Sequence, residues 1–158
     1  MDRTKTDYYG VKGWLLLLCV TFTILDPLTG FLTLMGVTNL LKPHFNEDPG
    51  LLKIILIGGI CSTCLIVYSM YAGVSLWKLA PNALITAKRY LRLLFYYSFF
   101  AIFLPSLVGL TEKTQTEFYK MNPLNNIIVM VYAGMWYLYL MKSRRVKATY
   151  GDGGSVEP

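Results

Sequence analysis

The chain has 158 residues, of which 54% are hydrophobic and only 15% charged, and its formal net charge at pH 7 is +6. Hydropathy this high, gathered in long blocks, indicates a membrane protein and argues against a soluble globular domain. The basic residues lie at the ends of the apolar blocks. They therefore favour a role in topology and in contact with anionic lipid over a nucleic-acid surface.

The first apolar block predicts a membrane-spanning helix over residues 13–41, preceded by a polar arm at residues 1–12. Roughly 20 apolar residues cross a hydrocarbon core of about 30 Å, and this block is long enough to do so. Pro27 lacks a backbone donor, so we expect a kink near the middle of the helix. No cleavage site of small residues follows the block, which we therefore interpret as a retained helix rather than a signal peptide.

Three further apolar blocks predict helices over residues 51–79, 90–110 and 123–142. Polar segments, most of them with proline, separate the blocks. Residues 143–158 are basic at first, and their last eight residues have the composition of a disordered tail. The sequence thus predicts an all-α polytopic membrane protein, with four transmembrane helices in one bundle over residues 13–142 and a cytoplasmic tail.

The distribution of positive charge predicts the orientation of this bundle. Eleven of the fifteen Lys and Arg residues lie in the N-terminal arm, in or next to the segment between the second and third blocks (Lys78, Lys88, Arg89 and Arg92), and at the C-terminal end. Positively charged loops stay in the cytoplasm, and interfacial aromatic residues such as Trp14, Trp77 and Trp136 gather at the same ends. We therefore expect both termini inside, in a multi-pass protein of the cell inner (cytoplasmic) membrane.

Asp26 is the single carboxylate between Trp14 and Leu41, and it falls near the middle of the first helix. An acid at that depth is costly and marks a functional site by default. Thr23, Thr29 and Thr33 lie on or beside the same helix face. Two interpretations stay open: a proton- or cation-handling site, or a neutral acid that is hydrogen-bonded to threonine hydroxyls or to a carbonyl freed by Pro27.

The second helix carries two further patterns. Cys61 and Cys64 form a C-x-x-C motif, but redox pairs of this kind usually lie at accessible helix N-termini, so we favour cysteines that only pack. Small residues recur at a spacing of four, which lets another backbone approach, within the bundle or in a homodimer. These residues are Gly58, Ser62, Ser69 and Gly73.

The C-terminal basic residues Lys142, Arg144, Arg145 and Lys147 are candidates for contact with anionic lipid headgroups. The sequence contains no glycine-rich phosphate loop, no nucleophile elbow and no H-E-x-x-H motif. We therefore expect no catalytic residues, no cofactor, no metal site and no nucleic-acid partner.

Several short motifs are typical of one family. They are Gly13-Trp14-Leu15-Leu16, Pro27-Leu28, Leu76-Trp77-Lys78, Pro81-Asn82-Ala83, Ala87-Lys88-Arg89-Tyr90-Leu91, Trp136-Tyr137, Tyr139-Leu140 and Ser143-Arg144-Arg145-Val146-Lys147-Ala148-Thr149-Tyr150. On these motifs residues 10–150 resemble the bacterial domain-of-unknown-function 2569 family. The resemblance implies a four-helix inner-membrane protein and no particular activity.

The leading functional hypothesis is a structural, accessory or assembly protein without catalysis, whose protein partners the sequence does not identify. The alternative is a small, dimeric, proton- or cation-coupled carrier that uses Asp26. It is similar to small multidrug transporters in having an acid in the first of four helices, although the strong charge bias predicts a single orientation. A weaker alternative is a membrane thiol oxidoreductase that uses Cys61 and Cys64.

Overall fold

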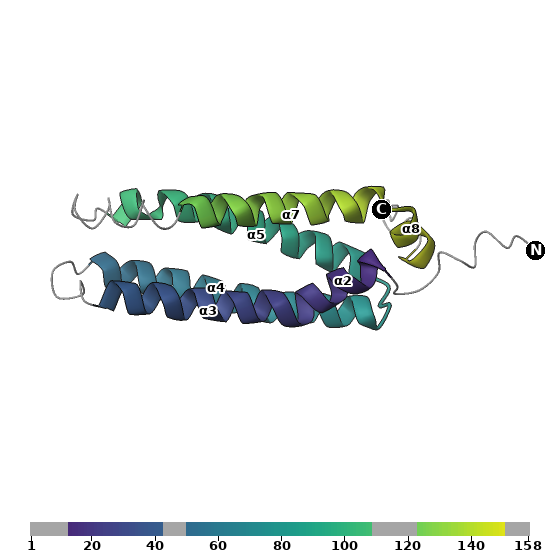
Figure 1. Cartoon of the computed structure of the whole chain (residues 1–158), viewed down its shortest axis with the longest axis horizontal. Helices are drawn as coiled ribbons and strands as arrows, with labels where there is room; N and C mark the ends of the chain where they lie inside the picture. The colour runs from purple at the N-terminus through teal and green to yellow at the C-terminus, as the bar shows by residue number, and fades with distance from the viewer. Residues whose placement is uncertain (1–12, 43–49, 109–122, 151–158) are drawn as a thin grey trace, which may run out of the picture.

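Helices make up the described part of the chain. The computed structural model describes residues 13–42, 50–108 and 123–150, and regular structure within them is helical throughout (Figure 1). In chain order the elements are α2 (Trp14–Val20), η1 (Thr21–Leu25), α3 (Asp26–Leu41), α4 (Gly50–Trp77), α5 (Ala83–Val108), α7 (Pro123–Lys142) and α8 (Arg144–Tyr150). The first three are continuous, and η1 is a π-helical turn within one long helix.

The predicted helices over residues 13–41, 51–79 and 123–142 agree closely with the observed bounds. The third predicted helix differs, because α5 begins at Ala83 and not at residue 90. The residues from Ala83 to Arg92 include no glycine or proline, and Ala, Leu, Lys and Arg favour helix, so the basic stretch extends the helix. The predicted arm at residues 1–12, the end of that helix at residue 110 and the tail from residue 151 lie outside the described residues.

The predicted basic tail over residues 143–158 begins with an ordered helix, α8. Val146 and Thr149 of this short helix are buried. The hydroxyl of Tyr150 donates a hydrogen bond of 2.7 Å to the carbonyl of Leu76, near the end of α4. The same carbonyl also accepts a hydrogen bond of 3.2 Å from the N–H of Leu79, so Tyr150 adds a second bond to it and holds α8 against α4.

The long helices are arranged as two antiparallel pairs (Figure 1). The continuous helix α2–η1–α3 packs on α4, α5 packs on α7, and α4 and α5 join the two pairs. The pairs converge at the end where α2 and α8 lie, and they separate towards the opposite end (Figure 1). Among the described residues, a hydrogen bond between Tyr132 and Asp26 joins α7 to the start of α3, but the two helices do not pack closely along their length.

Most of the buried core lies at the end where the pairs converge. Phe22 is buried there and meets the ring of Tyr90 edge to face, with ring centroids 5.0 Å apart. Aliphatic side chains from α2, α4, α5, α7 and α8 fill the rest of this core: Leu15, Leu18, Leu76, Leu91, Leu140 and Val146. Among the described residues, the continuous core therefore lies at this end.

Three helical segments of the described residues are long and apolar enough to cross a membrane: Trp14–Asn39, Gly50–Trp77 and Leu124–Lys142. Large apolar side chains are exposed along all of them, among them Ile60 and Val67 on α4. Continuous exposed apolar surface of this kind is unusual on a soluble monomer and fits contact with lipid. The chain is therefore an all-helical membrane protein.

Candidate functional site

The candidate site begins with the backbone around Pro27. The N–H of Asp26 donates to the carbonyl of Thr21, five residues earlier, which is the bond of a π-helical turn. The next hydrogen bond of the same π type would run from the N–H of residue 27 to the carbonyl of Phe22. Residue 27 is Pro27, which has no backbone N–H. The expected disturbance at Pro27 is thus a π turn, and it leaves the carbonyl of Phe22 without a partner from its own helix.

Ser69 on α4 satisfies that carbonyl. Its buried Oγ donates a hydrogen bond of 2.8 Å to the oxygen of Phe22. The two backbones come close here because Gly73 has no side chain: a Cβ at Gly73 would lie 2.5 Å from Cγ2 of Thr23 and 3.0 Å from its backbone nitrogen. The small residues of α4 therefore form a close contact within the chain at the π turn.

The carboxylate of Asp26 lies beside this contact and is bound from other helices. The hydroxyl of Tyr132 on α7 donates to Oδ1 at 2.8 Å, and that of Tyr90 on α5 donates to Oδ2 at 2.9 Å. Ser69 Oγ is also 3.5 Å from Oδ2, but its single proton already serves the Phe22 carbonyl. Hydroxyl donors suit a carboxylate acceptor, and Asp26 joins three helices through them.

The threonines expected beside Asp26 do not bind its carboxylate. The hydroxyls of Thr23, Thr29 and Thr33 donate at 2.7–2.8 Å to carbonyls four residues earlier in their own helix. Threonine in an apolar helix commonly bonds in this way, which satisfies the hydroxyl locally. Of the interpretations that the sequence left open, the one with threonine hydroxyls bonded to Asp26 is not what the described residues show, and the partners that the sequence did not reveal are Tyr90 and Tyr132.

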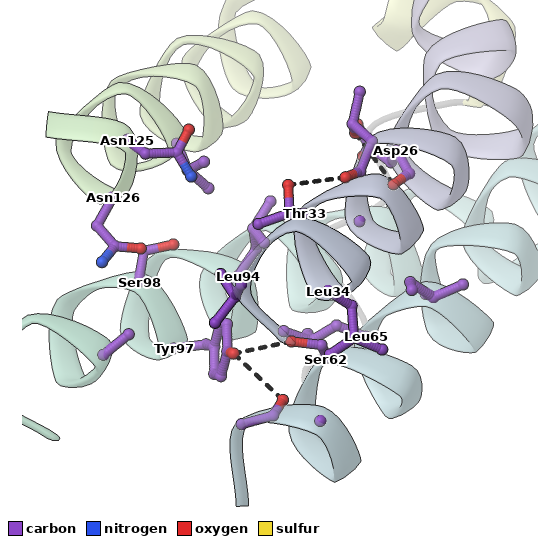
Figure 2. A pocket seen from close by; sticks show the side chains of 18 of the residues that line it. Asp26, Thr33, Leu34, Ser62, Leu65, Leu94, Tyr97, Ser98, Asn125 and Asn126 are labelled. Atoms are coloured by element: carbon purple, nitrogen blue, oxygen red, sulfur yellow. Dashed lines mark hydrogen bonds between the residues drawn. The ribbon is translucent and has the colours of Figure 1, made fainter. Parts of the chain in front are cut away.

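Asp26 lies in the wall of a cavity of about 490 Å³ between the two helix pairs. Thr29, Thr33, Ser62 and Tyr97 also line it, from α3, α4 and α5, and α7 contributes Asn125, Asn126 and Tyr132. Figure 2 labels several of the lining side chains: Asp26 lies at one end of the group, and Asn126 lies beside Ser98 at the other. A volume of this size is typical of sites that bind small molecules.

Polar contacts continue along the cavity at the junction of α4 and α5. The hydroxyl of Tyr97 shares a hydrogen bond of 2.8 Å with Ser62 Oγ and lies 3.3 Å from the carbonyl of Gly58 (Figure 2). All four predicted small residues of α4 thus have contacts within the chain. The predicted homodimer through this face stays a prediction, and these contacts argue against that face as its interface.

The other predicted site residues lie apart from this cavity. Cys61 and Cys64 are exposed on α4, whereas Cys19 is buried in the core. The described residues hold no cluster of three or more His, Cys, Asp or Glu side chains that fits a metal ion. Lys142, Arg144 and Lys147 are exposed on the last turn of α7 and on α8, and Arg145 is partly buried.

The sequence was compared with known families, curated proteins and solved structures. No curated protein and no solved structure matches it. Residues 8–151 match the family described as "Protein of unknown function (DUF2569)", which confirms the resemblance of residues 10–150. Because that match covers nearly the whole chain, this all-helical membrane protein belongs to the domain-of-unknown-function 2569 family.

Proposed function

We propose that the protein is a non-catalytic, four-crossing protein of the inner membrane that binds a small lipid-soluble molecule between its helix pairs. We propose further that Asp26 is a protonatable group in that site, as in a proton-coupled carrier. One observation supports this most: the chain's intramembrane acid lies in the wall of a cavity of about 490 Å³. An ionisable side chain within a membrane segment is rare and usually faces a pathway or a partner.

The proposed fourth crossing is α5. Its first half carries Lys88, Arg89 and Arg92, and the residues after Arg92 are mostly aromatic and aliphatic. The helix packs on both α4 and α7 and runs from the end where the helix pairs converge to the end where they separate (Figure 1). With the basic half in the cytoplasmic headgroup layer, both termini lie in the cytoplasm and the cavity opens towards the opposite face.

The tight core at the cytoplasmic end supports a one-sided site. Leu15, Phe22 and Leu76 are fully buried between Asp26 and that end. A carrier with this structure has its site accessible from one side, and transport requires that the core open while the other end closes. In this proposal the exposed Lys142, Arg144 and Lys147 bind anionic headgroups, each contributing about 1 kcal/mol near the surface.

A second candidate function follows from the partners of Asp26. Two tyrosine hydroxyls from α5 and α7 already bind its carboxylate, as a purely structural connection between helices does. An accessory or assembly role, in which Asp26 only holds the helices in place, uses the same contacts. The two candidates differ in whether Asp26 exchanges a proton with bulk water.

Infrared difference spectroscopy of the protein in lipid nanodiscs separates them. If Asp26 is the protonatable group, a carboxylic-acid carbonyl band appears reversibly on acidification between about pH 9 and pH 5, the range in which such a carrier operates. That band is absent from Asp26→Asn and unchanged in the matched control Asp152→Asn near the C-terminus. A parent protein whose spectrum shows no Asp26-dependent titration in this range contradicts the carrier role and leaves the structural one.

A further inference from the structure

The carboxylate of Asp26 has acceptor sites that the described residues do not fill. An ionised carboxylate offers about four lone-pair sites on its two oxygens. Tyr132 donates to Oδ1 and Tyr90 donates to Oδ2, whereas the proton of Ser69 goes to the carbonyl of Phe22. About two of the four sites therefore remain for donors from another molecule.

The two tyrosines hold the carboxylate without neutralising it. Donors on both oxygens suit the ionised form of Asp26, because a protonated acid would itself donate from one of them. The hydroxyls carry no charge, and the described residues that line the cavity include no Lys, Arg or His. A carboxylate at this depth is best stabilised by a positive group that also donates hydrogen bonds.

Asp26 is within reach of a molecule in the cavity. Its side chain lines the cavity, and the residue is only partly buried. Thr29 and Thr33 line the same cavity and are exposed along the next turns of α3. Each of these hydroxyls donates its proton within its own helix, so its oxygen can still accept a hydrogen bond from a ligand. This part of the wall therefore offers acceptors to a donor group.

The remaining wall suits an apolar group attached to such a cation. A positive group at the carboxylate also lies close to the rings of Tyr90 and Tyr132, and aromatic rings attract cations. Aliphatic side chains such as Leu25, Leu94 and Val129 also line the cavity. The ligand chemistry that fits both parts is an amphiphile with a positive head and an apolar body.

The arrangement of the helix pairs gives such a molecule a route from the bilayer. α3 and α7 do not pack closely along their length in the described residues, and the pairs separate away from the core (Figure 1). On this side a lipid-soluble molecule can approach the cavity without crossing a packed interface.

We propose that the cavity binds a lipid-soluble amine in its protonated form, whose ammonium N–H groups donate to the unfilled acceptor sites of Asp26. This inference rests on the proposed binding function and names the ligand class of that site. In the proposed carrier, the proton and the ammonium group occupy the carboxylate of Asp26 in turn.

Photolabelling in phosphatidylcholine liposomes tests the proposal with three probes that share one diazirine-bearing alkyl chain. The first probe is the primary amine, which is protonated at pH 7 as the lysine side chain is, the second is the alcohol and the third is the alkyl sulfate. We expect the amine to label peptides of α3, α5 or α7 in competition with unlabelled amine. The alcohol and the sulfate are expected to label these peptides several-fold less.

The decisive variant is Asp26→Asn, which keeps the shape of the side chain and removes its charge. Loss of a charge-assisted hydrogen bond predicts a fall of about tenfold or more in competable amine labelling, with alcohol labelling unchanged. Asp152→Asn near the C-terminus is the matched control and is expected to label as the parent does. Asp26→Ser, which also removes the charge, serves as a second variant if Asp26→Asn is not monodisperse in detergent.

Equal amine labelling of the parent and Asp26→Asn overturns the proposal. Competable alcohol labelling equal to that of the amine removes the amine class and leaves a binding site, whereas no competable labelling by any probe removes the binding site itself. The proton role fails separately. Asp26-dependent amine labelling without an Asp26 titration in the infrared experiment removes the proton role and leaves the amine site, and the reverse result leaves the proton role alone.

Discussion

At the scale of single residues, the closest approach between helices depends on Gly73. The π turn places Phe22 and Thr23 directly against this glycine, and Ser69, one turn earlier on α4, bonds the carbonyl of Phe22. Small residues allow such backbone contacts in membrane proteins, where close packing and interhelical hydrogen bonds replace the hydrophobic drive that water supplies. The close packing that places Asp26 at the cavity therefore depends on glycine, which has no Cβ, at position 73.

The substitution Gly73→Ala tests this dependence. A Cβ there would contact the side chain and the backbone nitrogen of Thr23, and backbone atoms cannot rotate away as a flexible side chain can. Overpacking of this kind costs about 1–3 kcal/mol, so we expect a lower melting temperature in detergent. Ser69 and Phe22 should separate as the helices move apart.

Gly134→Ala on α7 is the control for that experiment. A Cβ at Gly134 would meet no atom within 4 Å outside its own helix, so it adds a methyl group in open space. Alanine also favours the helix over glycine by roughly 1 kcal/mol in its interior. Melting temperatures that fall equally in both variants would show that the contact at Gly73 is not specific.

At the scale of elements, α8 is a short helix whose docking rests on few contacts. Seven residues are too few for a stable isolated helix in water, so α8 depends on its contacts with the rest of the chain. Its buried Val146 packs in the core, and Tyr150 donates to the carbonyl of Leu76. Burial raises the pKa of the Tyr150 hydroxyl.

The raised pKa has a definite consequence for pH dependence. A group whose pKa is higher in the folded state contributes its full stability below its unfolded pKa, which is about 10 for tyrosine, and loses it only as pH rises through the folded value. The Tyr150 hydroxyl therefore stays protonated and donates throughout the neutral range. Docking of α8 by this bond is expected to be independent of pH below about 10.

Tyr150→Phe tests the docking of α8. Removing the hydroxyl removes one of the two hydrogen bonds that the Leu76 carbonyl accepts, the other coming from the N–H of Leu79. The loss costs about 0.5–1.5 kcal/mol, which is enough to increase opening of a seven-residue helix several-fold. We expect trypsin to cleave after Arg144 or Lys147 faster than in the parent. Tyr96→Phe, an exposed tyrosine on α5, is the comparison. Cleavage at the parent rate would mean that the hydrogen bond does not hold α8.

At the scale of the whole molecule, packing is uneven between the two ends. The end with α2 and α8 has a continuous core, whereas the cavity occupies the region where the helix pairs separate. The proposed orientation puts the packed end in the cytoplasm, because the basic residues that follow α4, lie in the first half of α5, end α7 and belong to α8 are at or near that end. The side of the membrane on which each end of α5 lies therefore reports both the orientation of the chain and whether α5 crosses.

Cysteine accessibility in intact cells provides that test, in a background without the three native cysteines. Asn82→Cys lies between α4 and α5, and Gln115→Cys lies between α5 and α7 in the sequence. We expect a membrane-impermeant maleimide to label Gln115→Cys in intact cells but Asn82→Cys only after the cells are lysed. Labelling of both positions in intact cells would contradict the fourth crossing by α5, and the reverse pattern would contradict the orientation.

Local sequence patterns determined the helices and the presence of a buried acid. Bilayer thickness sets the length of an apolar block, so Trp14–Leu41 and Gly50–Trp77 are recognisable without any tertiary information. Pro27 likewise predicted a disturbance in its own helix, because its effect is confined to neighbouring backbone atoms. Asp26 was identifiable because an acid in such a block is rare.

Only the tertiary structure decided what surrounds Asp26. Tyr132, Tyr90 and Ser69 are 106, 64 and 43 residues from it in sequence, and their meeting depends on how each helix is rotated about its axis. These helices are apolar on nearly all sides, so the spacing of their residues does not reveal which face points inward. The cavity, the unpaired amide of Asn126 and the docking of α8 follow from the same rotations, which the sequence alone does not specify.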